Sequence, residues 1–571
     1  MRTKTFSLVL GLLLTLSVVP AQAETPATSS AVSSASSSGS LAGGFSGLMR
    51  QLTSAAGLTS DNMEYVTTIP VDAPGVSAKI RDHLDTPLLF ASGVKGLSIY
   101  DISDPASPTW LSSLPLPHSQ NEDVQVSEDG TRVVIAADGN LPAPNPITVG
   151  LHVIDTSEPD SPDWVAWKDD APNHTSACAD AACDWIYGSS GGIYEVVTRE
   201  GENGEDDEVT IEERGGWFEA AEQIDGHEAL TRSHALNRSV HPDPETGEPV
   251  DVLISDSTPR LMMDVNDPEN PVVLTSSGEA DLDDDGFLQH NSQRPNSQFW
   301  TPRDGDTGDG DQRRGGPPAG IPGDRGIGSV PEHAAPRSAD DDQGTDAATV
   351  EGTQIPAFEV SGNASGQRTA QWGDDWEDDG ISGGELRPGE LVLGNSESNI
   401  VPQCTDSSGG LTTWDASDFD QGEPMRIIDQ FRPVNSAPNS PFEHGNPPAN
   451  ALGCSGHWFD IQDGDNLIAA SWYEHGVKVI EIQEDYSMEQ IGYFQPVGTE
   501  AGAAYWVVDR ETGEEYIYSM DYARGLDIIR FHRDVEAADQ QSMAANYWRG
   551  ASRVAVDPSY YLYYKRHLHE H

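Results

Sequence analysis

Basic residues are scarce in this chain. Its 571 residues include 32 lysines and arginines against 94 aspartates and glutamates, which gives a formal net charge of −62. Proteins that bind nucleic acid neutralise phosphates with lysine and arginine, so this balance argues strongly against a nucleic-acid partner. A large negative charge is instead typical of a well-solvated surface, of cation binding or of a saline environment.

Long apolar runs are absent after the first 23 residues. Residues 1–23 contain a basic start, an apolar stretch and a terminal Ala-Gln-Ala, which together predict a secretory signal peptide cleaved before Glu24. An uncleaved membrane anchor is the alternative, but the apolar stretch is short for a membrane span. We therefore expect a secreted protein, extracellular or periplasmic, with no membrane span after signal cleavage.

Cysteine is also rare, with four residues in the chain. In an exported protein these are expected to form disulfides rather than free thiols. Proximity in sequence favours the pairs Cys178–Cys183 and Cys404–Cys454, although four cysteines allow three pairings. A thiolate metal site is not expected, because no fourth thiol lies near the other three.

Common catalytic motifs are missing as well. The sequence contains no Gly-rich phosphate cradle, no G-x-S-x-G elbow and no H-E-x-x-H helix. It therefore predicts no nucleotide cofactor and identifies no catalytic residue.

The chain does contain a repeated phrase. GLSIYDISDPASP (96–108) returns as GLHVIDTSEPDSP (150–162), as RLMMDVNDPENP (260–271) and, more loosely, as GLTTWDASD (410–418), with worn copies from Gly476 and Gly525. Its apolar residues favour a β-strand, and the Asp-Pro exit ends the strand in a turn. A unit that recurs every ~50 residues in an all-β sequence indicates a propeller or a solenoid.

Four strands per unit give an all-β, seven-bladed β-propeller over residues 60–534. The last blade lacks an outer strand, whereas MEYVTTIP (63–70) is a spare strand near the other end. We expect this N-terminal strand to complete the last blade, because closing the ring removes exposed sheet edges. In the third blade, GGWFEAAEQ (215–223) is the expected outer strand.

Three further segments lie outside the blades. Residues 24–59 are rich in alanine and serine and predict a flexible leader. Residues 302–389 form an acidic, Gly- and Pro-rich insertion between the first and second strands of blade 5, largely disordered, in which IPAFEVSG (355–362) is one candidate strand. Residues 535–571 form a C-terminal tail whose histidines are candidates for adventitious metal binding.

The repeated phrase, with its Gly-Leu start and Asp-Pro exit, resembles the repeat of the LVIVD-repeat propeller proteins. More distantly, the layout is similar to selenium-binding, methanethiol-oxidase-type propellers, although the cysteine signature of that family is missing here. This second resemblance implies a copper ion held by histidines that face the central channel.

Histidines recur near the starts of four inner strands. They are His174, His234, His290 and His457, while Tyr505 takes the matching place in blade 7 and His118 lies on a nearby loop. Inner strands of a propeller line one channel, so these starts should converge at one of its mouths. Converging imidazoles can hold Cu or Zn or bind an anion. The alternative is that each histidine only bonds neighbouring backbone or a channel water.

A second candidate metal site lies in DLDDDG (281–286). Asp281, Asp283 and Asp285 with Gly286 match the start of a calcium-binding loop, although Ser292 replaces the glutamate expected at position twelve. Such clusters also arise by chance in so acidic a chain.

Together these observations predict an exported, monomeric propeller that acts as a binding or scaffold module for a protein, a glycan or an ion at the channel mouth. The alternative is a metal-dependent oxidoreductase or hydrolase that uses the channel histidines and Cu or Zn. Imidazoles more than about 10 Å apart cannot share one ion, so geometry tests the second hypothesis.

Overall fold

The computed structural model describes residues 59–535 with internal gaps, of which the longest are 138–148, 296–348, 355–385, 398–409 and 434–454. All described residues belong to one compact unit, Ser46–His571. The predicted signal peptide, Asp281, Asp283, Asp285, His118, Cys404, Cys454 and residues 355–362 lie outside the described residues, as do the leader and tail apart from Thr59 and Val535.

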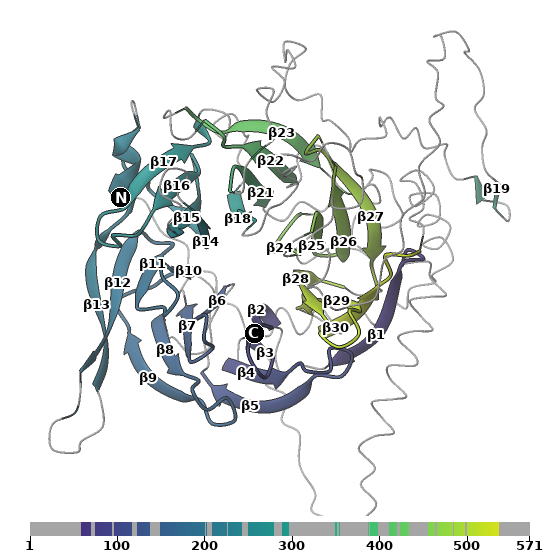
Figure 1. The fold of residues 1–571 in the computed structure, drawn as a ribbon, viewed down its shortest axis with the longest axis horizontal. Helices are drawn as coiled ribbons and strands as arrows, with labels where there is room; N and C mark the ends of the chain where they lie inside the picture. Colours follow the sequence, from purple (N-terminus) through teal and green to yellow (C-terminus); the bar gives the residue numbers. More distant parts are fainter. Residues whose placement is uncertain are drawn as a thin grey trace, which may run out of the picture. The chain divides into compact units, whose positions relative to one another are not determined.

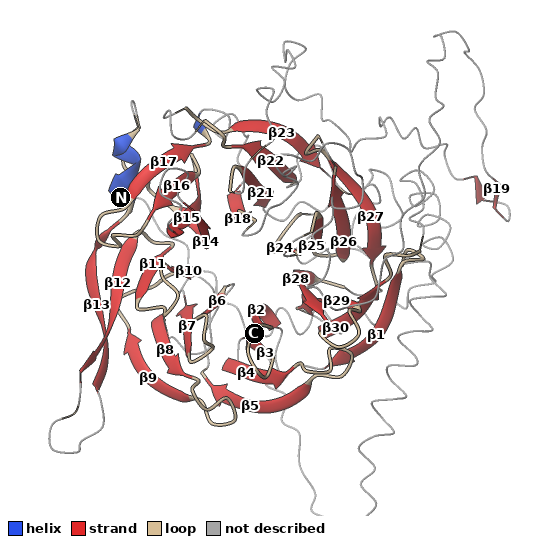
Figure 2. Cartoon of the chain, in the orientation of Figure 1, coloured by secondary structure: helices blue, strands red, loops and turns tan. Residues whose placement is uncertain are grey.

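The described strands form seven four-stranded antiparallel sheets, arranged as blades around a ring (Figures 1 and 2). Blade 1 contains β2 (Gly75–Arg81), β3 (Leu88–Gly93), β4 (Gly96–Asp101) and β5 (Thr109–Pro115). Blade 2 contains β6 (Val124–Val126), β7 (Arg132–Ala137), β8 (Gly150–Asp155) and β9 (Asp163–Lys168). Blade 3 contains β10 (Ser176–Cys178), β11 (Trp185–Gly188), β12 (Gly192–Arg199) and β13 (Glu208–Gly216). Blade 4 contains β14 (Ser233–Pro242), β15 (Pro249–Ser257), β16 (Leu261–Asp264) and β17 (Val272–Ser276).

The remaining blades follow the same order from the ring axis outward. Blade 5 contains β18 (Leu288–Gln293), β21 (Leu391–Glu397), β22 (Leu411–Asp415) and β23 (Arg426–Phe431). Blade 6 contains β24 (Phe459–Ile461), β25 (Leu467–Ser471), β26 (Val477–Ile482) and β27 (Met488–Phe494). Blade 7 contains β28 (Ala501–Val508), β29 (Glu515–Asp521), β30 (Gly525–Phe531) and, as its outer strand, β1 (Met63–Ile69).

The N-terminal strand closes the ring as predicted. β1 pairs antiparallel with β30, from Met63 opposite Phe531 to Ile69 opposite Leu526. Seven clusters of buried apolar side chains connect neighbouring blades, and the cluster that joins blade 7 to blade 1 also includes Ala235 and Trp458. The core therefore lies between blades, and closure leaves no blade with an uncovered face. The seven-bladed propeller is confirmed.

The predicted position of the insertion is also confirmed. β18 pairs with β21 across a gap of nearly one hundred residues in the sequence, so the intervening segment interrupts blade 5 between its first two strands. Within it, β19 (Thr349–Val350) and β20 (Thr353–Gln354) form a short hairpin.

The repeated phrase has a structural explanation. Its aspartate ends the third strand of a blade, and the Oδ1 atoms of Asp101, Asp155, Asp264 and Asp415 each accept a hydrogen bond from the backbone N–H two residues later. Such turns stop the strand and start the return to the outer strand. Gly96, at the start of one copy, has φ +134°, and a Cβ there would lie 2.2 Å from the Leu114 carbonyl oxygen.

The outer strand of blade 3 differs from the prediction. It is β13, which contains several glutamates, whereas most of the expected segment forms the 3₁₀ helix η3 (Phe218–Gln223). The prediction excluded this segment as a strand because of its glutamates. In the sheet, however, Arg214 forms ion pairs with Glu195 and Glu212 at neighbouring positions. Buried Trp217, just before η3, packs between blades 3 and 4 instead of continuing the strand.

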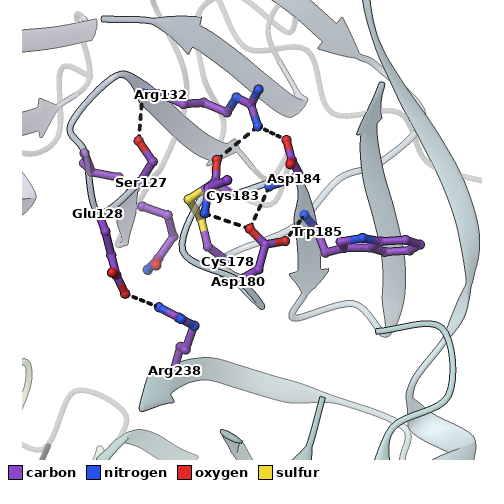
Figure 3. Close-up of a disulfide and its surroundings, with 12 residues drawn as sticks. Ser127, Glu128, Arg132, Cys178, Asp180, Cys183, Asp184, Trp185 and Arg238 are labelled. Atoms are coloured by element: carbon purple, nitrogen blue, oxygen red, sulfur yellow. Dashed lines mark hydrogen bonds and ion pairs between the residues drawn. A yellow bond between two sulfur atoms is a disulfide. The ribbon is translucent and has the colours of Figure 1, made fainter. Parts of the chain in front are cut away.

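The disulfide Cys178–Cys183 closes the turn between β10 and β11 (Figure 3). A backbone bond and a side chain connect this turn to blade 2. Glu128 N donates to Ala181 O at 2.8 Å, and the Arg132 guanidinium donates to Ala182 O and forms an ion pair with Asp184. Among the residues that the structure describes, no helix has the length and apolarity needed to cross a membrane.

Candidate functional site

Two of the four predicted histidines sit on bulges of inner strands. The register of β14 against β15 slips between Ser233 and Leu236, and that of β18 against β21 slips between Gln289 and Asn291. His234 and His290 lie within these irregular stretches. A bulge adds a residue to one strand and changes the direction of its side chain, and such bulges are often found next to functional sites. His174 and His457 lie just before β10 and β24.

The structure brings all four histidines into one continuous group. His174 Nε2 lies 3.0 Å from His234 Nε2, and the centroids of these rings are 4.6 Å apart. The rings of His234 and His290 are 4.2 Å apart, and those of His290 and His457 are 4.1 Å apart. His234, His290 and His457 are buried. Blades 3, 4, 5 and 6 each contribute one imidazole, which is the convergence that the sequence predicts.

A carboxylate completes this group. Ligand atoms of His234, His290 and Glu397 all lie within 4.8 Å of one another. Glu397 ends β21, which runs antiparallel to β18, so it lies beside the strand that carries His290. The Tyr473 hydroxyl donates to Glu397 Oε1 at 2.5 Å, and its ring lies 4.6 Å from that of His457. Tyr522 also approaches His457, with ring centroids 6.3 Å apart.

Backbone carbonyls fix the tautomers of two histidines. His234 Nδ1 lies 3.2 Å from the His290 carbonyl oxygen, and His457 Nδ1 bonds the carbonyl oxygen of Gly502. A carbonyl oxygen only accepts, so Nδ1 carries the proton in both neutral rings and Nε2 carries the lone pair. The Nε2 atoms of His234 and His457 are therefore the donor atoms that each ring offers to a ligand.

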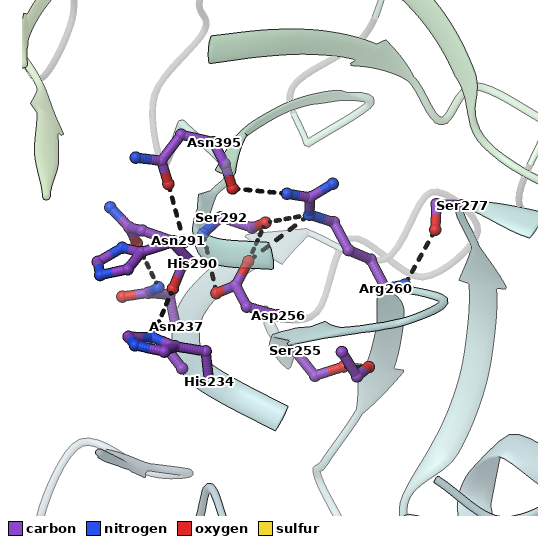
Figure 4. A network of polar contacts seen from close by, with 12 residues as sticks. His234, Asn237, Ser255, Asp256, Arg260, Ser277, His290, Asn291, Ser292 and Asn395 are labelled. Carbon is purple, nitrogen blue, oxygen red and sulfur yellow. Dashed lines mark hydrogen bonds and ion pairs between the residues drawn. The ribbon is translucent and has the colours of Figure 1, made fainter. Parts of the chain in front are cut away.

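A polar network supports the strands behind the histidines (Figure 4). Asn395 accepts from Asn291 N at 2.9 Å and donates to the His457 carbonyl oxygen, so it links the residue after His290 to His457. Asn237 Nδ2 donates to Asn291 Oδ1 at 2.7 Å. These bonds join blades 4, 5 and 6 and hold three of the histidine-bearing segments together.

The same network contains a buried ion pair. Asp256 accepts from Ser292 Oγ at 2.5 Å and from Ser292 N at 3.1 Å, and Arg260 Nε lies 3.6 Å from Asp256 Oδ1. Arg260 also donates to Ser292 Oγ and to the Asn395 carbonyl oxygen. Burial raises the pKa of Asp256 to about 7, although Arg260 and the bonds from Ser292 act in the opposite direction.

Other predicted site residues fall elsewhere. The Tyr505 hydroxyl accepts from Ala78 N of blade 1 at 3.1 Å, and burial raises the pKa of this phenol well above its usual range. The calcium-loop aspartates lie outside the described residues, so calcium binding there stays a prediction. Glu397 and Tyr473 were missed by the sequence prediction. Both residues lie at the end of the second strand of a blade. Antiparallel pairing places that end beside the start of the first strand, where the histidines lie.

Comparisons with known proteins show distant structural likeness. No family model matches the chain, and no curated protein sequence matches it. A similar solved structure is the β-propeller domain of Cps50 (Swd1) from Myceliophteria thermophila, with a TM-score of 0.41, 10% identity, and coverage of 81% of this chain and 98% of that one. Sqt1 of Saccharomyces cerevisiae has a TM-score of 0.39, 7% identity, and coverage of 83% and 89%.

A protein of unknown function from Desulfotomaculum acetoxidans has a TM-score of 0.35, 10% identity, and coverage of 76% of this chain and 89% of its own. Likenesses at this level carry no argument about function. The propeller assignment rests on the strand pairing, and no comparison shows the LVIVD-repeat or selenium-binding resemblance.

Proposed function

We propose that this chain is an exported propeller that binds one transition-metal ion where the inner strands of blades 3 to 6 begin. The candidate ligands are His174, His234, His290 and His457, with Glu397 as the anionic member, and the three whose ligand atoms all lie within 4.8 Å of one another are His234, His290 and Glu397. Export is supported by the predicted signal peptide and by the Cys178–Cys183 disulfide, which is stable in an oxidising compartment.

The observation that carries this proposal is the bonding of His234 and His457. Histidines that ligate metals almost always donate the other ring N–H to a carbonyl, a carboxylate or water, which fixes the tautomer. Both histidines have their Nδ1 atoms on backbone carbonyls. Hydrogen bonding to backbone alone explains one nitrogen of each ring, but it does not explain why the rings gather in one place.

The spacing and chemistry of the donors fit such an ion. Two nitrogens on one tetrahedral zinc lie about 3.3 Å apart, given Zn–N bonds of about 2.0–2.1 Å. The Nε2 atoms of His174 and His234 are 3.0 Å apart, so without an ion His174 Nε2–H donates to His234 Nε2, and an ion would replace this hydrogen bond. Imidazole nitrogen suits Cu and Zn, whereas Ca²⁺ and Mg²⁺ prefer oxygen. Of the protein, glycan and ion considered as ligands, these contacts favour the ion.

Metal analysis of untagged protein tests this proposal. Protein should be dialysed against limiting chelator, reloaded with Zn²⁺ or Cu²⁺, desalted and analysed for bound metal. One matched control is His532→Ala, which removes the histidine that follows β30 and contacts Glu64. The other control replaces His567, His569 and His571 with alanine. We expect one ion per chain in the wild type and in both controls.

The double variant His234→Gln, His290→Gln should lose the ion while keeping the wild-type circular dichroism spectrum. Retention of one ion per chain in this variant would overturn the proposal. Loss of the ion in the tail variant would overturn it as well, because binding would then belong to the C-terminal histidines. An ion-binding module and a metal-dependent enzyme would both bind metal at this group. This experiment tests metal binding and does not distinguish the two.

A further inference from the structure

Tyr473 has an unusual backbone conformation next to the histidine group. It follows β25 with φ +36°, a left-handed value that is uncommon for residues other than glycine. Its backbone forms an isolated bridge to Ala501 of blade 7, with N···O distances of 3.1 and 3.0 Å. Strained residues of this kind persist only where surrounding contacts determine them, and they gather at functional sites.

The side chain of Tyr473 reaches across blades. It is 3% exposed, its ring lies 4.6 Å from His457 of blade 6, and its hydroxyl donates to Glu397 of blade 5 at 2.5 Å. A hydrogen bond to an ionised carboxylate is shorter and roughly twice as strong as one between neutral groups. Tyr473 therefore contacts two residues of the group at once, while its backbone is anchored to a third blade.

Glu397 needs such a partner to act as a ligand. It is the last residue of β21, and a glutamate loses considerable rotamer entropy when its side chain is fixed in one orientation. A carboxylate has two oxygens with about four acceptor sites, so the bond from Tyr473 leaves capacity for an ion.

We propose that Tyr473 is the positioning residue that holds Glu397 as the anionic ligand beside His234 and His290. This inference rests on the proposed metal-binding function. Neutral imidazoles alone leave the full charge of a divalent ion uncompensated, so fixing the carboxylate increases the affinity for divalent ions. Loss of partners that orient a metal ligand typically costs 10–100-fold in metal affinity.

A double-mutant cycle tests whether Tyr473 acts through Glu397. Zn²⁺ affinity should be measured by chelator competition for the wild type, Tyr473→Phe, Glu397→Gln and the double variant. We expect each single variant to lose 10–100-fold, and the double variant to lose no more than Glu397→Gln does. The matched control is Tyr518→Phe, which removes the 2.7 Å hydrogen bond from buried Tyr518 of blade 7 to the Pro105 carbonyl oxygen of blade 1. It should bind Zn²⁺ like the wild type.

Cu²⁺ spectra give a second readout that a purely structural role would not change. The electron paramagnetic resonance and visible spectra of Cu²⁺-loaded Tyr473→Phe should move toward those of Glu397→Gln, and those of Tyr518→Phe should match the wild type. Additive losses in the cycle, or wild-type affinity in Tyr473→Phe, would overturn the inference. If Tyr473→Phe does not fold, unchanged affinity in Glu397→Gln would also overturn it.

These results separate the two proposals. A wild-type protein that binds no Zn²⁺ or Cu²⁺ contradicts the proposed function itself. A wild type that binds one ion, together with an additive cycle, leaves the metal site in place and contradicts only the role of Tyr473.

Discussion

Replacing Arg260 with methionine should destabilise the protein more at pH 9 than at pH 6. The reason is Asp256, which is 1% exposed and has its pKa raised to about 7, first by burial. A carboxyl whose folded pKa exceeds its unfolded value stabilises the protein fully below the unfolded pKa. That stability is lost as the pH rises through the folded pKa.

The magnitude follows from the linkage relation. Each pKa unit corresponds to about 1.36 kcal/mol, so the rise from 3.8 to about 7 costs the wild type about 4 kcal/mol by pH 8. Arg260 opposes this rise, so the pKa of Asp256 should increase further without it. Each further unit by which this pKa rises costs the variant about 1.4 kcal/mol more at a pH above it.

At pH 6 Asp256 is largely protonated in both folded proteins, so the penalty is limited to lost contacts of the guanidinium. Arg260 donates to Ser292 and to Asn395, and its guanidinium carbon lies 5.7 Å from the Trp414 ring centroid. Losing hydrogen bonds of this kind costs about 2 kcal/mol. With the pH-dependent loss added, the penalty at pH 9 should reach the 3–5 kcal/mol typical of breaking a buried ion pair.

Urea unfolding curves at pH 6 and pH 9 measure this difference. The control is Arg199→Met, whose ion pair with Glu212 is largely exposed and should contribute no more than about 1 kcal/mol at either pH. A second variant, Asp256→Asn, should remove the fall in stability that Asp256 causes between pH 4 and pH 7. Equal penalties for Arg260→Met at the two pH values would refute the reasoning.

Three further predictions concern other parts of the propeller. Replacing Cys178 and Cys183 together with serine should cost about 2 kcal/mol in calorimetry, because the disulfide closes a loop of only a few residues; an unchanged Tm would contradict this. Lys478→Met should stabilise the protein at pH 7. Burial lowers the pKa of this lysine well below 10.5, so its cost grows as the pH falls from 10.5; a less stable variant at pH 7 would contradict the prediction. Thr68→Val should cost about 2 kcal/mol by removing its bond to buried Asp527, and amide exchange should increase in β1 and β30 but not in β14.

Much of the fold could be predicted because each blade repeats the same local requirements. The aspartate of the repeated phrase caps a turn at four copies, and Gly96 and Gly150 adopt a positive φ at two of them, so these requirements are visible in the sequence. The outer strand of blade 3 was predicted wrongly because its glutamates are compensated by arginines on and beside it. That compensation depends on sheet pairing, which local composition does not show.

The histidines could be predicted to converge because each occupies the same place relative to its own blade. Glu397 and Tyr473 could not be found in this way. Their roles depend on a contact between the ends of second strands in two different blades, and neither residue recurs at a fixed interval. The strain at Tyr473 is likewise a property of the backbone and leaves no trace in the sequence.

Bulges at the starts of inner strands contribute residues to the histidine group. In blades 1, 4, 5 and 7 the first strand slips against the second at its start. In blades 4 and 5 that slip contains His234 and His290. In blade 7 it contains Gly502, where an added Cβ would lie 2.6 Å from the Tyr522 ring. Gly502 instead contributes its carbonyl oxygen, which accepts from His457 Nδ1. The bulges therefore supply two of the four histidines and a backbone acceptor for a third, whereas His174 and His457 lie just before inner strands of regular register.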